Sequence, residues 1–153
     1  MKGWKWYEPL TWILGIEAAG FLSASLSGEM GTVYAMLAKP PLAPPGWLFA
    51  AVWPVLYALL ALAAWRIHRR GAREGTRFWF WVQLGGNLAW SPLFFRFRLF
   101  WAAALLLLGM ILLTAWLLRA FARLDRVAAW LFAPYLPWLL YAWYLNLGVA
   151  WLA

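Results

Sequence analysis

The chain has 153 residues, of which 67% are hydrophobic and only 12% are charged, and its mean hydropathy is strongly positive at +0.71. A soluble domain needs about a quarter of its residues charged to cover its surface, so this composition excludes an ordinary soluble domain. The net charge of +8 does not require nucleic acid as a partner, because Lys and Arg also gather in the cytoplasmic loops of membrane proteins.

Five predominantly apolar runs are long enough to cross a bilayer. A hydrocarbon core of about 30 Å needs roughly 20 helical residues, and continuous apolar runs favour helices over the alternating strands of a membrane barrel. We therefore predict an all-α integral membrane bundle of five transmembrane helices that forms one domain over residues 1–153. The expected helices cover residues 7–27, 47–65, 78–95, 99–121 and 127–151.

The first run contains Glu17, an acid in the middle of a predicted span. Its start resembles a secretory signal, but the charge of Glu17 within the run favours a retained helix. An acidic residue inside a membrane is a hypothesis for a functional site. Three interpretations stay open: a proton or cation site, a contact with a partner hydroxyl, or the true edge of the segment.

Residues 28–46 connect the first two predicted helices and are rich in proline. The stretch AKPPLAPPGW holds Pro40, Pro41, Pro44 and Pro45. Each proline fixes its own φ and favours an extended conformation in its predecessor, so we expect a stiff loop that loses little entropy when it settles on the bundle.

Polar and aromatic residues recur at helical spacing in the later runs. Tyr57 follows Trp53 by one turn, around Pro54. One helical stripe of the third run and one of the fifth also combine polar and aromatic residues. An amide in hydrocarbon must find a partner or line a cavity. These stripes comprise Gln83, Asn87, Trp90, Ser91 and Phe94, and then Tyr135, Trp138, Ala142 and Asn146, beside Pro134 and Pro137.

Two interpretations of the stripes remain. The asparagines could join helices by hydrogen bonds while the aromatic residues only pack. Alternatively, broad aromatic faces with a few convergent polar groups line a pocket for a flat, conjugated ligand. Gly85 and Ala89 form a pair of small residues one turn apart, which favours close helix packing or dimerisation.

Several chemistries lack the residues they need. The chain has no cysteine, and its single histidine, His68, lies in a basic loop where a solvated side chain is the more common role. We find no catalytic triad, paired carboxylates, zinc motif or phosphate-binding loop, and therefore predict no metal site and no required cofactor. Any enzymatic activity would use aromatic side chains together with an external oxidant or light.

The distribution of basic residues predicts an orientation. Ten Lys and Arg residues fall at the amino terminus and in the second and fourth loops, whereas three fall in the first and third loops. By the positive-inside rule the amino terminus is cytoplasmic in a bacterial inner membrane, and the proline-rich loop faces outward.

Three blocks in the same order resemble the translocator protein or tryptophan-rich sensory protein (TspO/MBR) family, formerly called peripheral benzodiazepine receptors. They are KPPLAPPGWLFAAVWPVLY at Lys39–Tyr57, QLGGNLAWSPLFF at Gln83–Phe95 and PYLPWLLYAWYLN at Pro134–Asn146. The resemblance implies a five-helix bundle, commonly a homodimer, whose first loop is a lid over a ligand pocket. It also implies binding of porphyrins, above all protoporphyrin IX, and of isoquinoline and benzodiazepine-type compounds.

The resemblance, with the stripes, defines the expected ligand-binding residues. These are Tyr34, Trp47, Phe49, Trp53, Tyr57, Asn87, Trp90, Phe94, Tyr135, Trp138, Ala142 and Asn146. In some relatives the tryptophans that match Trp53 and Trp138 are linked to light- and oxygen-dependent porphyrin breakdown. The expected function is therefore a membrane receptor or carrier for porphyrin-like tetrapyrroles, with a porphyrin-degrading enzyme as the alternative and a transporter coupled through Glu17 as a third possibility.

The chain also departs from the family pattern. Val33 and Leu42 stand where aromatic residues are common, so the lid is less aromatic, and Gly85 with Gly86 replaces bulkier residues. No Lys or Arg follows Tyr144, so the carboxy-terminal cholesterol-recognition pattern is absent. We therefore expect tetrapyrrole and membrane lipid as partners rather than cholesterol as the physiological ligand.

Overall fold

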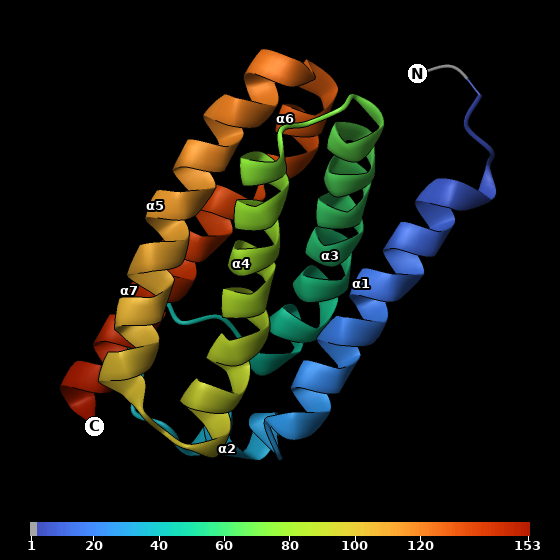
Figure 1. Cartoon of the computed structure of the whole chain (residues 1–153). Helices are drawn as coiled ribbons and strands as arrows, with labels where there is room; N and C mark the ends of the chain where they lie inside the picture. Colours follow the sequence, from blue (N-terminus) through green and yellow to red (C-terminus); the bar gives the residue numbers. More distant parts are fainter. Residues whose placement is uncertain (1–2) are drawn as a thin grey trace.

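The computed structural model describes residues 3–153 and folds them into an all-helical bundle, as the apolar runs predict (Figure 1). The long helices are α1 (Tyr7–Leu26), α3 (Gly46–Arg69), α4 (Glu74–Ser91), α5 (Phe100–Leu124) and α7 (Tyr135–Leu152). Helices α2 (Met30–Met36) and α6 (Arg126–Phe132) are short, and a π-helical turn, η1 (Pro92–Arg96), extends α4. Met1 and Lys2, one of the basic residues in the charge count, lie outside the described residues.

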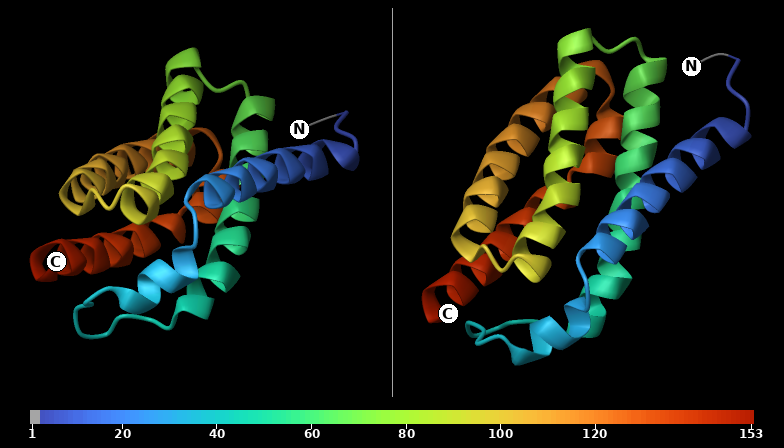
Figure 2. Two further views of the ribbon diagram at one scale, coloured as in Figure 1. Left: turned by 90° about the horizontal axis from the view of Figure 1, so that it is seen from below. Right: turned by 60° about the horizontal axis from the view of Figure 1, so that its bottom comes forward.

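The long helices lie side by side, with α1 at one edge of the bundle and α5 at the other (Figure 1). Helix α5 packs against α4 and α7, α1 packs against α3, and α3 packs against α6. Helix α2 and the loop that follows it lie at the same end of the bundle as the carboxyl terminus (Figure 2). The proline-rich loop and the end of α7 are therefore neighbours.

The surface of the bundle is apolar where a soluble protein would be polar. Leu14 of α1 is 61% exposed, and Leu105 and Leu112 of α5 are 71% and 65% exposed. Three described helices, α1, α3 and α5, are long and apolar enough to cross a membrane. Large apolar side chains that point outward along such helices match a hydrocarbon solvent, whereas in water they would form patches prone to association.

Aromatic packing forms the core where α4, α5 and α6 meet. The Phe121 and Phe132 rings lie 4.9 Å apart, and Phe80 lies 6.3 Å from each of them. All three side chains are completely buried. This core holds the end of the bundle that is opposite the proline-rich loop.

A buried carboxylate connects three elements at that same end. Asp125 caps α6 by accepting a hydrogen bond from the Val127 amide, and Arg66 of α3 donates to both of its carboxylate oxygens, at 2.7 and 3.2 Å. Burial acts to raise the pKa of the Asp125 carboxyl, but the hydrogen bond and charge of Arg66 and the backbone amides outweigh it and hold the pKa below its ordinary value. Asp125 therefore joins α3 to the turn between α5 and α6.

The elements differ from the predicted segments at two places. The predicted helix 127–151 is divided into α6 and α7, because Pro134 and Pro137 lack the amide hydrogens that a continuous helix needs. The predicted loop 28–46 contains α2, a helix of 7 residues. Within residues 37–45 the chain is non-helical, as its prolines require.

Candidate functional site

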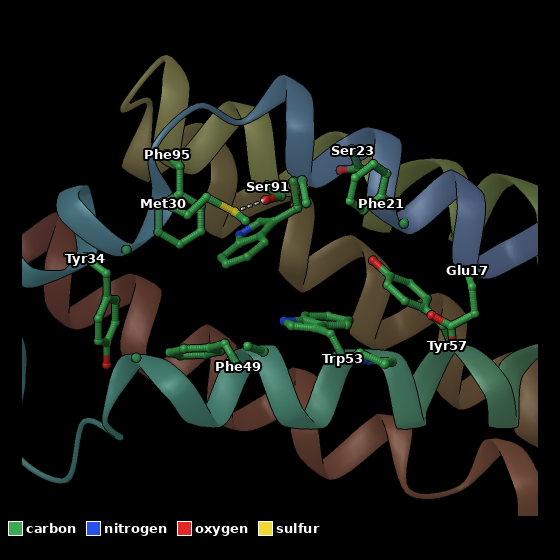
Figure 3. A pocket seen from close by; sticks show the side chains of 17 residues that line it. Glu17, Phe21, Ser23, Met30, Tyr34, Phe49, Trp53, Tyr57, Ser91 and Phe95 are labelled. Carbon is green, nitrogen blue, oxygen red and sulfur yellow. Dashed lines mark hydrogen bonds between the residues drawn. The ribbon is translucent and has the colours of Figure 1, made fainter.

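A cavity of about 520 Å³ is lined by residues of α1, α2, α3, α4 and η1, with α3 along one side (Figure 3). Its lining is overwhelmingly apolar. This volume falls within the range of about 300–1,000 Å³ that is typical of small-molecule sites. The cavity is the candidate functional site.

Aromatic side chains from α3 form one wall. Phe49, Trp53 and Tyr57 are spaced by four residues, so they share one face of the helix and point toward the cavity (Figure 3). The Trp53 and Tyr57 rings are stacked, with centroids 5.5 Å apart and planes 29° apart. Tyr34 of α2 meets Phe49 edge to face at 5.2 Å and closes that end. Such a surface suits a flat aromatic ligand.

The asparagines of the predicted stripes hold the wall residues in place. Asn87 accepts a hydrogen bond from the Tyr57 hydroxyl at 3.3 Å and donates one to the Tyr135 hydroxyl at 2.6 Å. Asn146 accepts from the Trp90 indole at 3.0 Å and donates to the Phe100 carbonyl at 2.8 Å. Both amides are buried and satisfied by protein groups, so they orient Tyr57 and Trp90 instead of facing a ligand.

Trp138 supports the α3 wall from behind. Its ring meets Trp53 edge to face at 6.1 Å and Phe49 at 5.7 Å. Its buried Nε1 has no hydrogen-bond partner among residues 3–153. Trp138 therefore contacts the lining without belonging to it.

The proline-rich loop is attached to α7 by two tyrosines. Tyr141 donates a hydrogen bond to the Leu42 carbonyl, and Tyr144 donates one to the Pro41 carbonyl at 2.6 Å. Gly148 lets the Pro40 ring approach closely, because a Cβ at that position would overlap the ring. Since Tyr141 also meets Trp138 at 5.8 Å, the loop is connected to the support behind the cavity wall.

Tyr34 fixes the other side of the same loop. Its hydroxyl donates to the Pro44 carbonyl, and Lys39 donates to the Tyr34 and Leu37 carbonyls while its ammonium lies 4.7 Å from the Tyr34 ring centre. Burial, followed by the nearby Tyr141, raises the pKa of the Tyr34 hydroxyl, so it remains a neutral donor at physiological pH. The proline-rich loop is thus held at both ends.

The predicted binding residues fall into three groups. Tyr34, Phe49, Trp53, Tyr57 and Trp90 line the cavity. A second group lies behind the lining. Its members contact the lining residues or are buried in the core, and they are Asn87, Phe94, Tyr135, Trp138, Ala142 and Asn146. Trp47 is 69% exposed and lies outside the lining, because it occupies the first turn of α3 on the outward face. Pro40, Pro41, Pro44 and Pro45 do not line the cavity either.

Apart from Glu17, the residues of α1 that line the cavity were not among the predicted site residues. Gly20, Phe21, Ser23 and Ala24 also line the cavity, as do Met30, Ser91 and Phe95. A signal was present, because Glu17, Gly20 and Ala24 are spaced by three and four residues and therefore share one face of α1. At Gly20 a Cβ would overlap the Tyr57 ring, so this glycine lets α1 approach the α3 wall.

The small residues of α4 face different ways. Gly85 and Ala89 are exposed on the surface of the bundle. Gly86 faces α5, where a Cβ would lie 3.3 Å from Met110. The exposed pair is available for contact with another helix.

Comparisons with known proteins show the family to which the chain belongs. A family model described as the TspO/MBR family matches residues 12–152. The chain is 34% identical to the translocator protein of Bos taurus, over 92% of this chain and 87% of the relative. It is 38% identical to the tryptophan-rich sensory protein of Cereibacter sphaeroides, over 74% and 72%, and 30% identical to the protein CrtK of Rhodobacter capsulatus, over 89% and 91%. The chain is therefore a membrane protein of the TspO/MBR family.

Proposed function

We propose that this protein is a membrane receptor or carrier that binds porphyrin-like tetrapyrroles, such as protoporphyrin IX, in the cavity between α1, α2, α3 and α4. The observation that carries the proposal is the cavity itself, whose wall of Phe49, Trp53 and Tyr57 presents aromatic surface to a flat conjugated ligand. Family membership supports it, since relatives are named as translocator and sensory proteins.

The shape of the site also suggests how a ligand enters. Helix α2 lines one end of the cavity, and the proline-rich loop that follows it is held by hydroxyl-to-carbonyl hydrogen bonds from Tyr34, Tyr141 and Tyr144. Individual hydrogen bonds of this kind contribute only about 0.5–1.5 kcal/mol, so the loop can detach without unfolding the helices. We assign it the role of a lid.

We further propose that all five long helices span the membrane. Asn87 of α4 and Asn146 of α7 point into the bundle, where they form hydrogen bonds with other helices. The outer faces of α4 and α7 therefore meet lipid. The excess of basic residues at the α3–α4 and α5–α6 turns supports a cytoplasmic amino terminus and an outward-facing lid in a bacterial inner membrane. The exposed pair Gly85 and Ala89 is our candidate for a homodimer contact.

The binding proposal is tested by titrating the purified protein with protoporphyrin IX and following quenching of tryptophan fluorescence. Trp53→Leu should weaken binding about tenfold or more, because it removes the central ring of the wall. Trp130→Leu is the matched control, since Trp130 is 77% exposed on the outer surface. Equal affinities for the Trp53→Leu variant and the control would contradict the proposal.

A second candidate is an enzyme that degrades protoporphyrin IX with light and molecular oxygen as the oxidant. The contact between Trp53 and Trp138 at 6.1 Å favours it, because a second redox-capable indole stands directly behind the one that would touch the ligand. Illumination should then yield a new product spectrum that is lost in Trp53→Phe and Trp138→Phe. Bleaching equal to that of free porphyrin would leave the binding function alone.

A further inference from the structure

Among residues 3–153 the cavity lining contains one carboxylate, that of Glu17, and no lysine, arginine or histidine. Glu17 lies near the middle of α1, so it does not mark the edge of that helix. Figure 3 shows its side chain pointing from α1 toward α3, beside Tyr57. The Tyr57 hydroxyl donates to Asn87 and not to Glu17, so a partner hydroxyl does not explain the acid.

No protein cation among the described residues balances this carboxylate. Within residues 3–153 Glu17 has no hydrogen bond and no ion pair. The basic residues that have a partner in this part of the chain bind groups other than Glu17. Arg66 binds Asp125, Lys39 binds the carbonyls of the lid, and Arg96 donates to the Leu26 carbonyl. A carboxylate at the surface of an apolar cavity is costly unless a positive charge approaches it, so the compensating charge has to come from a ligand or a proton.

The surroundings of Glu17 favour an organic cation. Tyr57 lies beside the carboxylate, and Trp53 is stacked on Tyr57 at 5.5 Å. Aromatic rings attract ammonium and phosphonium groups electrostatically, and the remaining apolar lining accepts a hydrophobic body. We propose that the cavity also binds lipophilic organic cations, with Glu17 as the counter-ion and the rings of Tyr57 and Trp53 as the surface on which the cation rests.

This inference uses the cavity of the proposed function but does not require that function. Protoporphyrin IX carries two propionates, which Glu17 repels, so a bound porphyrin turns these groups toward the lid. A cation is drawn toward Glu17. Removal of the negative charge should therefore weaken cation binding and strengthen porphyrin binding, and these opposite responses separate the two ideas.

The test compares a cation with its neutral counterpart. The probes are (pyren-1-ylmethyl)trimethylammonium and pyren-1-ylmethanol, titrated against the protein in nanodiscs of zwitterionic phosphatidylcholine while tryptophan fluorescence is followed. The wild-type protein should bind the cation about tenfold more tightly than the neutral probe. Glu17→Gln should abolish this preference, and Glu17→Asp, which keeps the charge, should restore part of it.

Glu74→Gln is the matched control, because Glu74 is exposed in the first turn of α4 and lies outside the lining. It removes the same charge and should keep the full preference. Equal cation affinity in the wild-type protein and in Glu17→Gln, with the helical content of both equal by circular dichroism, would overturn the inference. Cation binding that depends on Glu17, in a protein that binds no porphyrin, would overturn the proposed function and leave this inference standing.

Discussion

The indole Nε1 of Trp90 donates a hydrogen bond to Oδ1 of Asn146 at 3.0 Å, which ties a residue of the cavity wall to a residue of α7 that does not reach the cavity. Asn146 is itself held by its bond to the Phe100 carbonyl. The orientation of Trp90 therefore depends on a chain of contacts across α4, α7 and the start of α5.

Asn146→Ala should loosen Trp90 and weaken ligand binding without removing any side chain that lines the cavity. The variant leaves the buried indole N–H without a partner, which costs about 1–3 kcal/mol of stability. We expect porphyrin affinity to fall about five- to tenfold by fluorescence quenching. Leu140→Ala is a control on the exposed face of α7 and should bind like the wild-type protein. Unaltered affinity in Asn146→Ala would show that the bond does not position Trp90 for binding.

The two tyrosines that hold the lid should control the rate of ligand release. Tyr141→Phe with Tyr144→Phe removes both hydroxyls that donate to the Leu42 and Pro41 carbonyls but keeps the rings. Each lost hydrogen bond contributes about 0.5–1.5 kcal/mol, so the dissociation rate should rise about fivefold or more in stopped-flow displacement of the porphyrin. A dissociation rate equal to that of the wild-type protein would contradict the assignment of a lid.

The prolines of the lid should increase ligand affinity, because they lower the conformational entropy of the open lid. Pro44→Ala with Pro45→Ala frees the backbone before α3, and a proline in a compatible conformation is worth about 0.4–1 kcal/mol. Ligand affinity should fall roughly four- to thirtyfold while the helical content by circular dichroism stays constant. If affinity and helical content both remain those of the wild-type protein, residues 37–45 are only a linker.

Asp125 should make the stability of the bundle depend on pH in the acidic range. Its folded pKa is held below the unfolded value, so its carboxylate stabilises the fold above the unfolded pKa, which is about 3.9, and this contribution is lost as the pH falls further. Asp125→Asn should lose about 1.5–3 kcal/mol at neutral pH and show a flatter acid profile in thermal unfolding in detergent. Glu74→Gln is the control and should keep the wild-type profile. If the stability of Asp125→Asn still falls steeply at acidic pH, a group other than Asp125 causes the pH dependence.

The helices could be predicted from the sequence because apolar length alone defines a span in hydrocarbon. The break between α6 and α7 was missed because the run around Pro134 carries no charge, and hydropathy does not register a missing amide hydrogen. Helix α2 was missed because a helix of 7 residues is too short for a periodic signal.

The site was predictable where aromatic residues share one helical face, as Phe49, Trp53 and Tyr57 do on α3. Periodicity showed that Asn87 and Asn146 face inward, but it could not show that protein groups satisfy both amides. Spacing could show that Gly20 shares a helical face with Glu17, but the contact of Gly20 with the Tyr57 ring depends on the distance between α1 and α3, which no local pattern encodes.

The central claim, that ligands occupy this cavity, is tested most directly by filling it. Ala24 lines the cavity from α1, whereas Ala18 of the same helix is exposed and lies outside the lining. Ala24→Trp should place an indole in the cavity and abolish protoporphyrin binding in a fluorescence titration, while Ala18→Trp should keep the affinity of the wild-type protein. Equal binding by both variants, with both correctly folded by circular dichroism, would show that the ligand binds elsewhere and would contradict the account.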